Sequence, residues 1–200
     1  MTALDPTLEV PRDPSRQPAR AAAQPAGPRR PDLRFLLAHP AHLIALGFGA
    51  GLSRWAPGTA GTLWAWASFL VIDRVFGGPR GDLLWALLIA GGAGIGWWAC
   101  TVTARHLQTA DPGAIVWDEV IAFWAILWLL MPAGFWAQLV AFALFRYFDA
   151  AKPGPVAWAD ALFKRRRFGA GVGWAQGFGI LFDDAVAALC TLLVIALWRF

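Results

Sequence analysis

Residues 115–124 have the sequence IVWDEVIAFW, which joins two acids, Asp118 and Glu119, directly to a run of large apolar side chains. The rest of the chain is similarly apolar: 58% of its 200 residues are hydrophobic, only 15% are charged, and 13 are Trp. Soluble domains of this length are far less apolar, so the composition predicts an integral membrane protein. The length allows one domain of four to six spans at about 20 residues each.

Five apolar segments are long enough, or nearly so, to be read as membrane helices. They lie at about 59–76, 83–104, 120–131, 135–148 and 185–198. The third and fourth are separated only by residues 132–134, which predicts a tight helical hairpin. Before them, FLLAHPAHLIALGFGAG is broken by Pro40 and ends in glycines, as is typical of an interfacial or re-entrant helix. The sequence therefore predicts an all-α, polytopic membrane helical bundle of about five spans, preceded by this short helix.

Residues 1–34 hold seven of the 14 prolines and six arginines, which predicts a disordered, basic tail before a membrane domain at 35–200. With the N-terminus in the cytoplasm, most of the 17 Lys and Arg residues fall on the cytoplasmic side of a five-span arrangement. The exceptions are Arg74, Arg80 and Arg199. This asymmetry fixes the predicted orientation and explains the net charge of +4 without nucleic-acid binding.

Two further stretches repeat the junction of acids with apolar residues. FRYFDAAKP at 145–153 carries Asp149, and GILFDDAVAAL at 179–189 carries Asp183 and Asp184. In the predicted topology these acids share the cytoplasmic face with Asp118 and Glu119. Ionised groups beside hydrocarbon lose hydration and repel each other, so the cluster is costly unless it holds a cation. A Mg²⁺ ion, which prefers oxygen ligands, is the predicted metal.

A structural explanation exists for most of these acids. Asp118 with Glu119, and Asp183 with Asp184, are predicted at helix starts, where the helix dipole favours an anion without any further function. Asp149 is different, because it is predicted at a helix C-terminus, where the dipole opposes an anion. An ion pair with Arg146, three residues earlier, is the structural alternative there.

The loop GFGAGLSRWAPGTAGTL at 47–63 is the predicted phosphate cradle, because glycines let backbone N–H groups approach an anion and a helix N-terminus adds partial positive charge. Close helix packing through small residues is the alternative. Arg146 and Lys152 flank Asp149 and suit phosphate oxygens, although Lys152 also fits a simple cytoplasmic anchor. His42 precedes the loop and is the histidine considered for proton transfer. Asp160 is predicted in a solvated loop.

Four strings, GFGAGLSRWAPGTAGT, IVWDEVIAFW, FRYFDAAKPGPV and GFGILFDDAVA, in this order and spacing, resemble the phosphatidylglycerophosphatase A family of bacterial membranes. The resemblance runs from about His39 to Ala188. It implies a Mg²⁺-dependent phosphatase that acts on a phospholipid, phosphatidylglycerophosphate, at the cytoplasmic face of the inner membrane. Arg54 and Gln176 depart from the family pattern, which bears on loop geometry and substrate contacts.

The resemblance also implies which residues form the site. The catalytic and metal-binding acids would be Asp118, Glu119, Asp149, Asp183 and Asp184. Substrate contacts would come from Ser53, Gly58, Thr59, Arg146, Lys152 and His42, with Gly51 and Pro57 shaping the loop.

Two chemical routes remain open: attack by a metal-bound water with Asp118 or Glu119 as base, or a phosphoaspartate intermediate. A small membrane cation transporter or channel is the alternative function, but it predicts ionisable residues deep inside the spans. The sequence does not indicate an oligomeric state.

Overall fold

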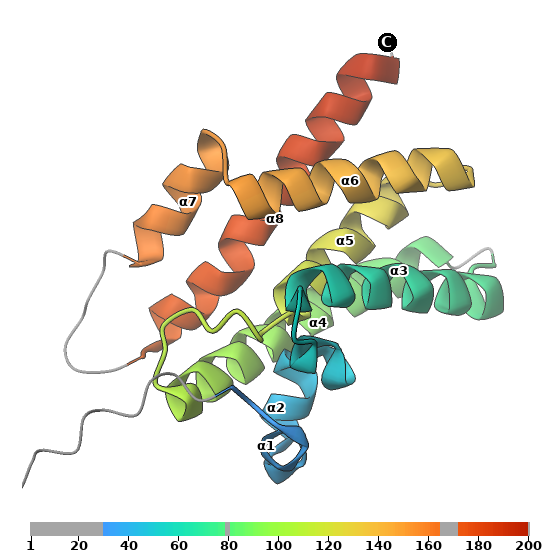
Figure 1. Ribbon diagram of the computed structural model, residues 1–200. Coiled ribbons are helices and arrows are strands. Elements are labelled where there is room, and N and C mark those ends of the chain that lie inside the picture. The colour runs from blue at the N-terminus through green and yellow to red at the C-terminus, as the bar shows by residue number, and fades with distance from the viewer. Residues whose placement is uncertain (1–29, 79–80, 165–171, 200) are drawn as a thin grey trace, which may run out of the picture.

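Figure 1 shows the computed structural model of the chain, which describes residues 30–78, 81–164 and 172–199. Within these residues the regular elements are all helices, so the predicted all-α class is confirmed. Each of the five predicted spans corresponds to one helix. These are α3 (Pro57–Phe76), α4 (Gly81–Leu107), α5 (Trp117–Leu130), α6 (Phe135–Ala151) and α8 (Trp174–Arg199).

Two of these helices, α4 and α8, are long and apolar enough to cross a membrane, with mean hydropathies of 1.6 and 2.3 in their most apolar windows. Only 22% of that window in α4 and 39% in α8 is buried inside the protein. A core helix of a soluble protein would be mostly buried, whereas Leu87 on α4 and Leu197 on α8 are exposed. The two helices therefore indicate membrane association. The remaining three predicted spans do not pass the same test.

Helix α5 is the centre of the bundle, and it packs against α3, α4, α6 and α8. Its side chains are buried almost all round, including Phe123 and Ile126, as expected for a helix that is apolar on every face. Glycines on α4 permit the close approach: a Cβ on Gly96 would lie 2.5 Å from the Trp117 ring. Trp117 also donates from Nε1 to the carbonyl of Gly92 at 2.9 Å. These contacts fix the N-terminal end of α5, where Asp118 and Glu119 lie.

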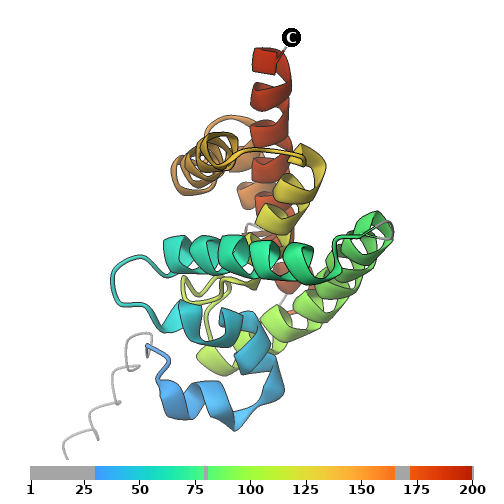
Figure 2. The ribbon, with the colours of Figure 1, turned by 90° about the vertical axis from the view of Figure 1, so that its right-hand side faces the viewer.

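The segment before α3 is broken into short helices, as predicted. Helix α1 (Leu33–Ala38) begins two residues before the predicted start of the membrane domain, and α2 (Pro40–Ala45) and the 3₁₀ segment η2 (Gly47–Leu52) follow. His39 separates α1 from α2 and caps α2, because its Nδ1 accepts from the Ala41 N–H at 3.1 Å. These elements lie below α3 in Figure 2. Of the predicted tail at 1–34, residues 1–29 lie outside the described residues.

Helix α8 starts at Trp174, well before the predicted start at 185, so the prediction that Asp183 and Asp184 begin a helix is wrong. The glycines in the added turns, Gly177 and Gly179, disfavour a helix by intrinsic propensity. They are retained because a Cβ on Gly177 would overlap Thr101 of α4, and one on Gly179 would overlap Phe163. Tertiary packing therefore extends the helix and places both acids in its interior.

A seventh helix, α7 (Pro155–Lys164), was not predicted, and it packs along α8. Asp160 lies on it, so the prediction of a solvated loop is wrong. The short connection between α5 and α6 is as predicted, but the two helices diverge from it in both views, and α6 packs mainly on α8. The divergence matters because it brings the C-terminal end of α6 to the middle of α8.

Candidate active site

The five predicted acids converge from three helices. Asp118 and Glu119 are in the first turn of α5, Asp149 is in the last turn of α6, and Asp183 and Asp184 are in the interior of α8. The charges of the other four acids all act on Asp184, and those of Glu119, Asp183 and Asp149 act on Asp118. The structure therefore forms one acidic cluster from residues separated by up to 66 positions in the chain.

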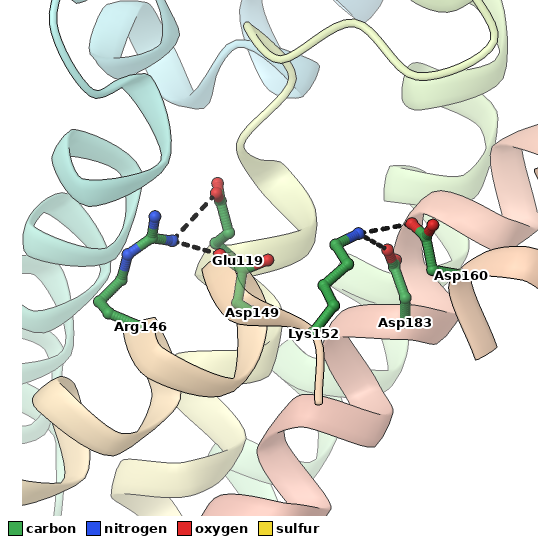
Figure 3. Close-up of polar contacts among 6 residues, drawn as sticks. All are labelled: Glu119, Arg146, Asp149, Lys152, Asp160 and Asp183. Carbon is green, nitrogen blue, oxygen red and sulfur yellow. Dashed lines mark hydrogen bonds and ion pairs between the residues drawn. The ribbon is translucent and has the colours of Figure 1, made fainter. Parts of the chain in front are cut away.

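Arg146 joins α6 to α5 at one side of this cluster (Figure 3). Its Nη1 donates to Asp149 Oδ2 at 2.5 Å and to Glu119 Oε1 at 3.3 Å. All three side chains are largely shielded from solvent, where an ion pair is less screened than at a surface. The ion pair with Arg146, given above as the structural alternative for Asp149, is present, and Glu119 also takes part in it.

Lys152 makes the matching connection on the other side (Figure 3). Its Nζ lies 2.5 Å from Asp183 Oδ2 on α8 and 2.5 Å from Asp160 Oδ1 on α7. Lys152 is the C-cap of α6 and has a left-handed backbone, with φ of 44°, a conformation usually taken by glycine at this position. Burial lowers the pKa of Lys152, but the hydrogen bonds to Asp160 and Asp183 outweigh it and raise the pKa above its usual value. Lys152 is therefore a charged cross-link between three helices, and not a simple anchor.

Within the described residues, three carboxylate oxygens of the cluster are buried and have no hydrogen-bond partner: Asp118 Oδ1, Glu119 Oε2 and Asp184 Oδ2. Such groups are costly when left unsatisfied. Burial raises the pKa of Asp118 well above its usual value. It also raises the pKa of Glu119 to about 8, with Asp149 adding to the effect and Arg146 opposing it. A cation would relieve both problems, and carboxylate oxygens are the ligands that Mg²⁺ prefers.

The side-chain positions of the described residues do not form a complete metal site. Among the described residues, no group of three or more His, Cys, Asp or Glu side chains is placed closely enough around one point to hold an ion. The donor chemistry and the unpartnered oxygens fit a metal, and the present side-chain positions would have to close around it.

The N-terminus of α3 faces the same cluster. A Cβ added to Gly58 would overlap Glu119 Oε1 and lie 3.0 Å from both terminal nitrogens of Arg146. No side chain caps this helix end, and Pro57 occupies its first turn, so backbone N–H groups there remain available for an anion. Thr59 is in the same turn, and Ser53 lies at the end of η2 with an exposed side chain. The predicted phosphate cradle thus lies against the acids.

His42 lies instead in a histidine cluster that was not predicted. Its Nε2 is 2.7 Å from His106 Nδ1, and its Nδ1 is 2.7 Å from the carbonyl of Phe35. The rings of His39 and His106 are 5.4 Å and 5.0 Å from that of His42. Both ring nitrogens of His42 are thus engaged within the protein, and among the described residues its hydrogen bonds and ring contacts are with Phe35, His39 and His106 and not with the acids.

Sequence reasoning missed two acids of the site. Asp160 bonds Lys152, and the charge of Asp111, in the loop between α4 and α5, acts on Asp118, Glu119 and Asp183. Both line a small cavity beside Asp183. Neither adjoins a long apolar run, so the signal that identified the other acids was absent. The basic run KRRR at 164–167 lies almost entirely outside the described residues.

The sequence is similar to those of known proteins over most of its length. The family model described as phosphatidylglycerophosphatase A matches residues 43–199. Phosphatidylglycerophosphatase A of Escherichia coli is 36% identical over 81% of this chain and 87% of its own length, and that of Haemophilus influenzae is 32% identical over 81% and 90%. A Bacteroides thetaiotaomicron protein provisionally named phosphatidylinositol-3-phosphatase is 37% identical over 78% and 92%. No solved structure gives a significant match.

Proposed function

The chain belongs to the phosphatidylglycerophosphatase A family, a family of phosphate monoester hydrolases, and from that premise we propose that it removes the terminal phosphate of phosphatidylglycerophosphate to leave phosphatidylglycerol. The observation that carries the proposal is the position of Gly58. It brings an uncapped helix N-terminus against Glu119 and Arg146, so a phosphate and a group of carboxylates would meet at one point. A site of this kind suits transfer of a phosphoryl group to water.

We further propose that the hydrolysis requires Mg²⁺. Asp118, Glu119, Asp149, Asp183 and Asp184 would hold the ion, and three of them have buried oxygens without a partner. When bound, Mg²⁺ would neutralise phosphate charge and lower the pKa of a water ligand. The acids by themselves would repel a phosphate dianion, so a cation also explains how substrate and carboxylates share the site.

The protein groups have separate tasks in this mechanism. The α3 N-terminus and Arg146 bind the phosphate oxygens, which fixes the phosphorus for attack. A carboxylate takes a proton from water as the water oxygen forms a bond to phosphorus. The bond between phosphorus and the glycerol oxygen then breaks, and the proton passes to that oxygen. Asp118 is the better base of the two predicted acids, because Glu119 is already held by Arg146. In that role Asp118 would not be bound to the metal, and the other four acids would hold it.

A phosphoaspartate intermediate is the competing route, in which a carboxylate oxygen replaces water as the first nucleophile. Rapid quenching that traps a phosphorylated protein would establish that route. The alternative of a cation transporter or channel gains no support from the comparisons. Asp118, Glu119 and Asp149 lie at the ends of α5 and α6, whereas Asp183 and Asp184 lie in the interior of α8.

The proposed topology has five spans with the acids on the cytoplasmic side of a bacterial inner membrane. It is supported by the asymmetry of basic residues and by the one-to-one match of predicted spans with helices. Helices α5 and α6, at 14 and 17 residues, are short for a membrane of ordinary thickness. They would span it only together with their flanking connections.

The direct test is phosphate release by the purified protein from phosphatidylglycerophosphate, phosphatidic acid and phosphatidylinositol 3-phosphate. We expect phosphatidylglycerophosphate to have the highest kcat/KM. Stripping bound metal with EDTA should reduce its hydrolysis at least ~100-fold, and Mg²⁺ should restore it, because a bound metal supplies several kcal/mol of transition-state stabilisation. Full turnover in EDTA would remove the metal from the proposal. A preference for phosphatidylinositol 3-phosphate would assign the substrate of the Bacteroides relative instead.

Gly58→Ala should lower kcat/KM by roughly 10- to 100-fold. The added methyl group would displace the Glu119 carboxylate and crowd Arg146, and forced repacking of this size costs about 1–3 kcal/mol. Gly113→Ala is the matched control, because a Cβ there meets nothing within 4 Å. Measured on the same lipid, equal activity of the two variants would show that the α3 N-terminus does not contact the reacting phosphate.

A further inference from the structure

An apolar groove of 540 Å³ runs between α4, α5 and α8, and Asp118 of the acidic cluster forms part of its wall. Its lining is apolar except for one charged residue, Asp118. A second acid of the cluster, Asp184, immediately precedes Ala185, which lines the groove. Apolar walls would contribute no binding energy to a ligand that is only a water-soluble phosphate. An apolar groove that contains a carboxylate of the proposed site is therefore unusual unless the substrate also has an apolar part.

The groove is long enough to hold a lipid tail. From Asp118 to Ala125 the wall follows α5 for about 10 Å, and from Phe178 to Leu192 it follows α8 for about 21 Å, at about 1.5 Å per residue. The hydrocarbon of one leaflet is about 15 Å deep. The groove volume also lies within the range of about 300–1,000 Å³ that is typical of ligand pockets.

Small side chains keep the groove open on all three helices. Ala93 and Gly94 contribute from α4, Ala122 and Ala125 from α5, and Ala185 from α8. A Cβ on Gly94 would meet nothing within 4 Å, so no packing need explains glycine at this position. Glycine inside a helix is also unfavourable by intrinsic propensity. The small residues are therefore best explained by the space that they leave.

We infer that this groove binds one acyl chain of the phospholipid substrate and so positions its headgroup phosphate at the acids. The inference rests on the proposed function, because the continuity of the groove with Asp118 identifies the occupant as the tail of the molecule whose phosphate reacts there. Burial of methylene groups in the groove would supply binding energy remote from the reacting bond. The enzyme would then discriminate its substrates by chain length as well as by headgroup.

The test uses Gly94→Leu, because Gly94 lines the groove and a Cβ there meets nothing within 4 Å. Gly91→Leu is the control, since Gly91 is in the same helix, is exposed, has open space around its Cβ and does not line the groove. Each protein is assayed in detergent micelles with dipalmitoyl and with dihexanoyl phosphatidylglycerophosphate. We expect Gly94→Leu to lose about 10-fold in kcat/KM on the dipalmitoyl lipid and less than about 2-fold on the dihexanoyl lipid, whereas Gly91→Leu retains wild-type values.

Each other outcome would overturn the inference. Equal activity of the two variants on the dipalmitoyl lipid would show that the groove holds only bulk lipid. Equal losses on both lipids would show general damage to the fold. A changed oligomeric state with unchanged activity would assign the groove to a second copy of the chain. Wild-type protein that hydrolyses neither lipid would instead refute the proposed function, and that failure is visible before any variant is assayed.

Discussion

Replacing Asp149 with Asn is expected to lower turnover of the lipid phosphate at least ~100-fold while the protein remains in the membrane. The change preserves side-chain volume and removes the charge that a cation needs, and loss of a metal contact of several kcal/mol corresponds to this factor. It also removes the negative charge that pairs with Arg146 at 2.5 Å. The helix dipole opposes an anion at the end of α6, so Asp149 is not needed there for helix stability and the variant should fold.

Asp82→Asn is the control for this experiment. Asp82 Oδ1 accepts a hydrogen bond from Trp128 Nε1 at 3.0 Å, and the amide oxygen of Asn can accept the same bond. The residue is at the start of α4, at the opposite end of that helix from the site. Phosphate release and the amount of membrane-extracted protein are measured for both variants. If Asp149→Asn retained the activity of Asp82→Asn, the acidic cluster would not be the site of hydrolysis.

The structure changes what Asp160 should do. From the sequence alone, Asp160→Asn would be a silent change in a solvated loop. In the structure Asp160 accepts from Lys152, which also holds Asp183. Removal of this charge would leave Lys152 paired with Asp183 alone, so Asp160 is unsuitable as an inert control.

The acids at the borders of apolar runs could be identified from sequence because their physical cost is visible there. Asp118 and Glu119 stand directly before a hydrophobic stretch, and Asp149 stands at the wrong end of a helix dipole. The sequence also predicted five helices and the break at Pro40. These features depend on local composition and on residues within a turn or two of each other.

Features that depend on tertiary packing were not predictable in the same way. Helix α8 starts early because Gly177 and Gly179 pack closely against Thr101 and Phe163. In isolation, glycine disfavours a helix. The bond between His42 and His106 joins residues 64 positions apart. Lys152 acts as a cross-link only because α7 returns along α8. A single sequence contains no signal for such pairings.

The second prediction concerns membrane topology. Its expected effect is large, because labelling of a cysteine from outside the cell is nearly all or none. We expect cysteines at Gly78 and Gly134 to react with an impermeant thiol reagent in intact cells, and cysteines at Gly113 and Ala157 to be shielded. All four positions are exposed, and the background would lack Cys100 and Cys190. In Figure 1 the end of α3 and the connection before α6 lie at the right, away from α7.

Labelling at Gly134 distinguishes between a topology with two membrane spans and one with five. If only α4 and α8 cross the membrane, the chain does not cross between residues 108 and 173, and Gly134 must lie on the same side as Gly113. With five spans it lies on the opposite side, because α5 leads out and α6 leads back. Labelling at both positions, or at neither, would therefore refute five spans. Opposite results at Gly113 and Ala157 would be more damaging. Asp118 follows Gly113 in the chain and Asp183 follows Ala157, so the two acids would then lie on opposite sides of the membrane and could not share one metal ion.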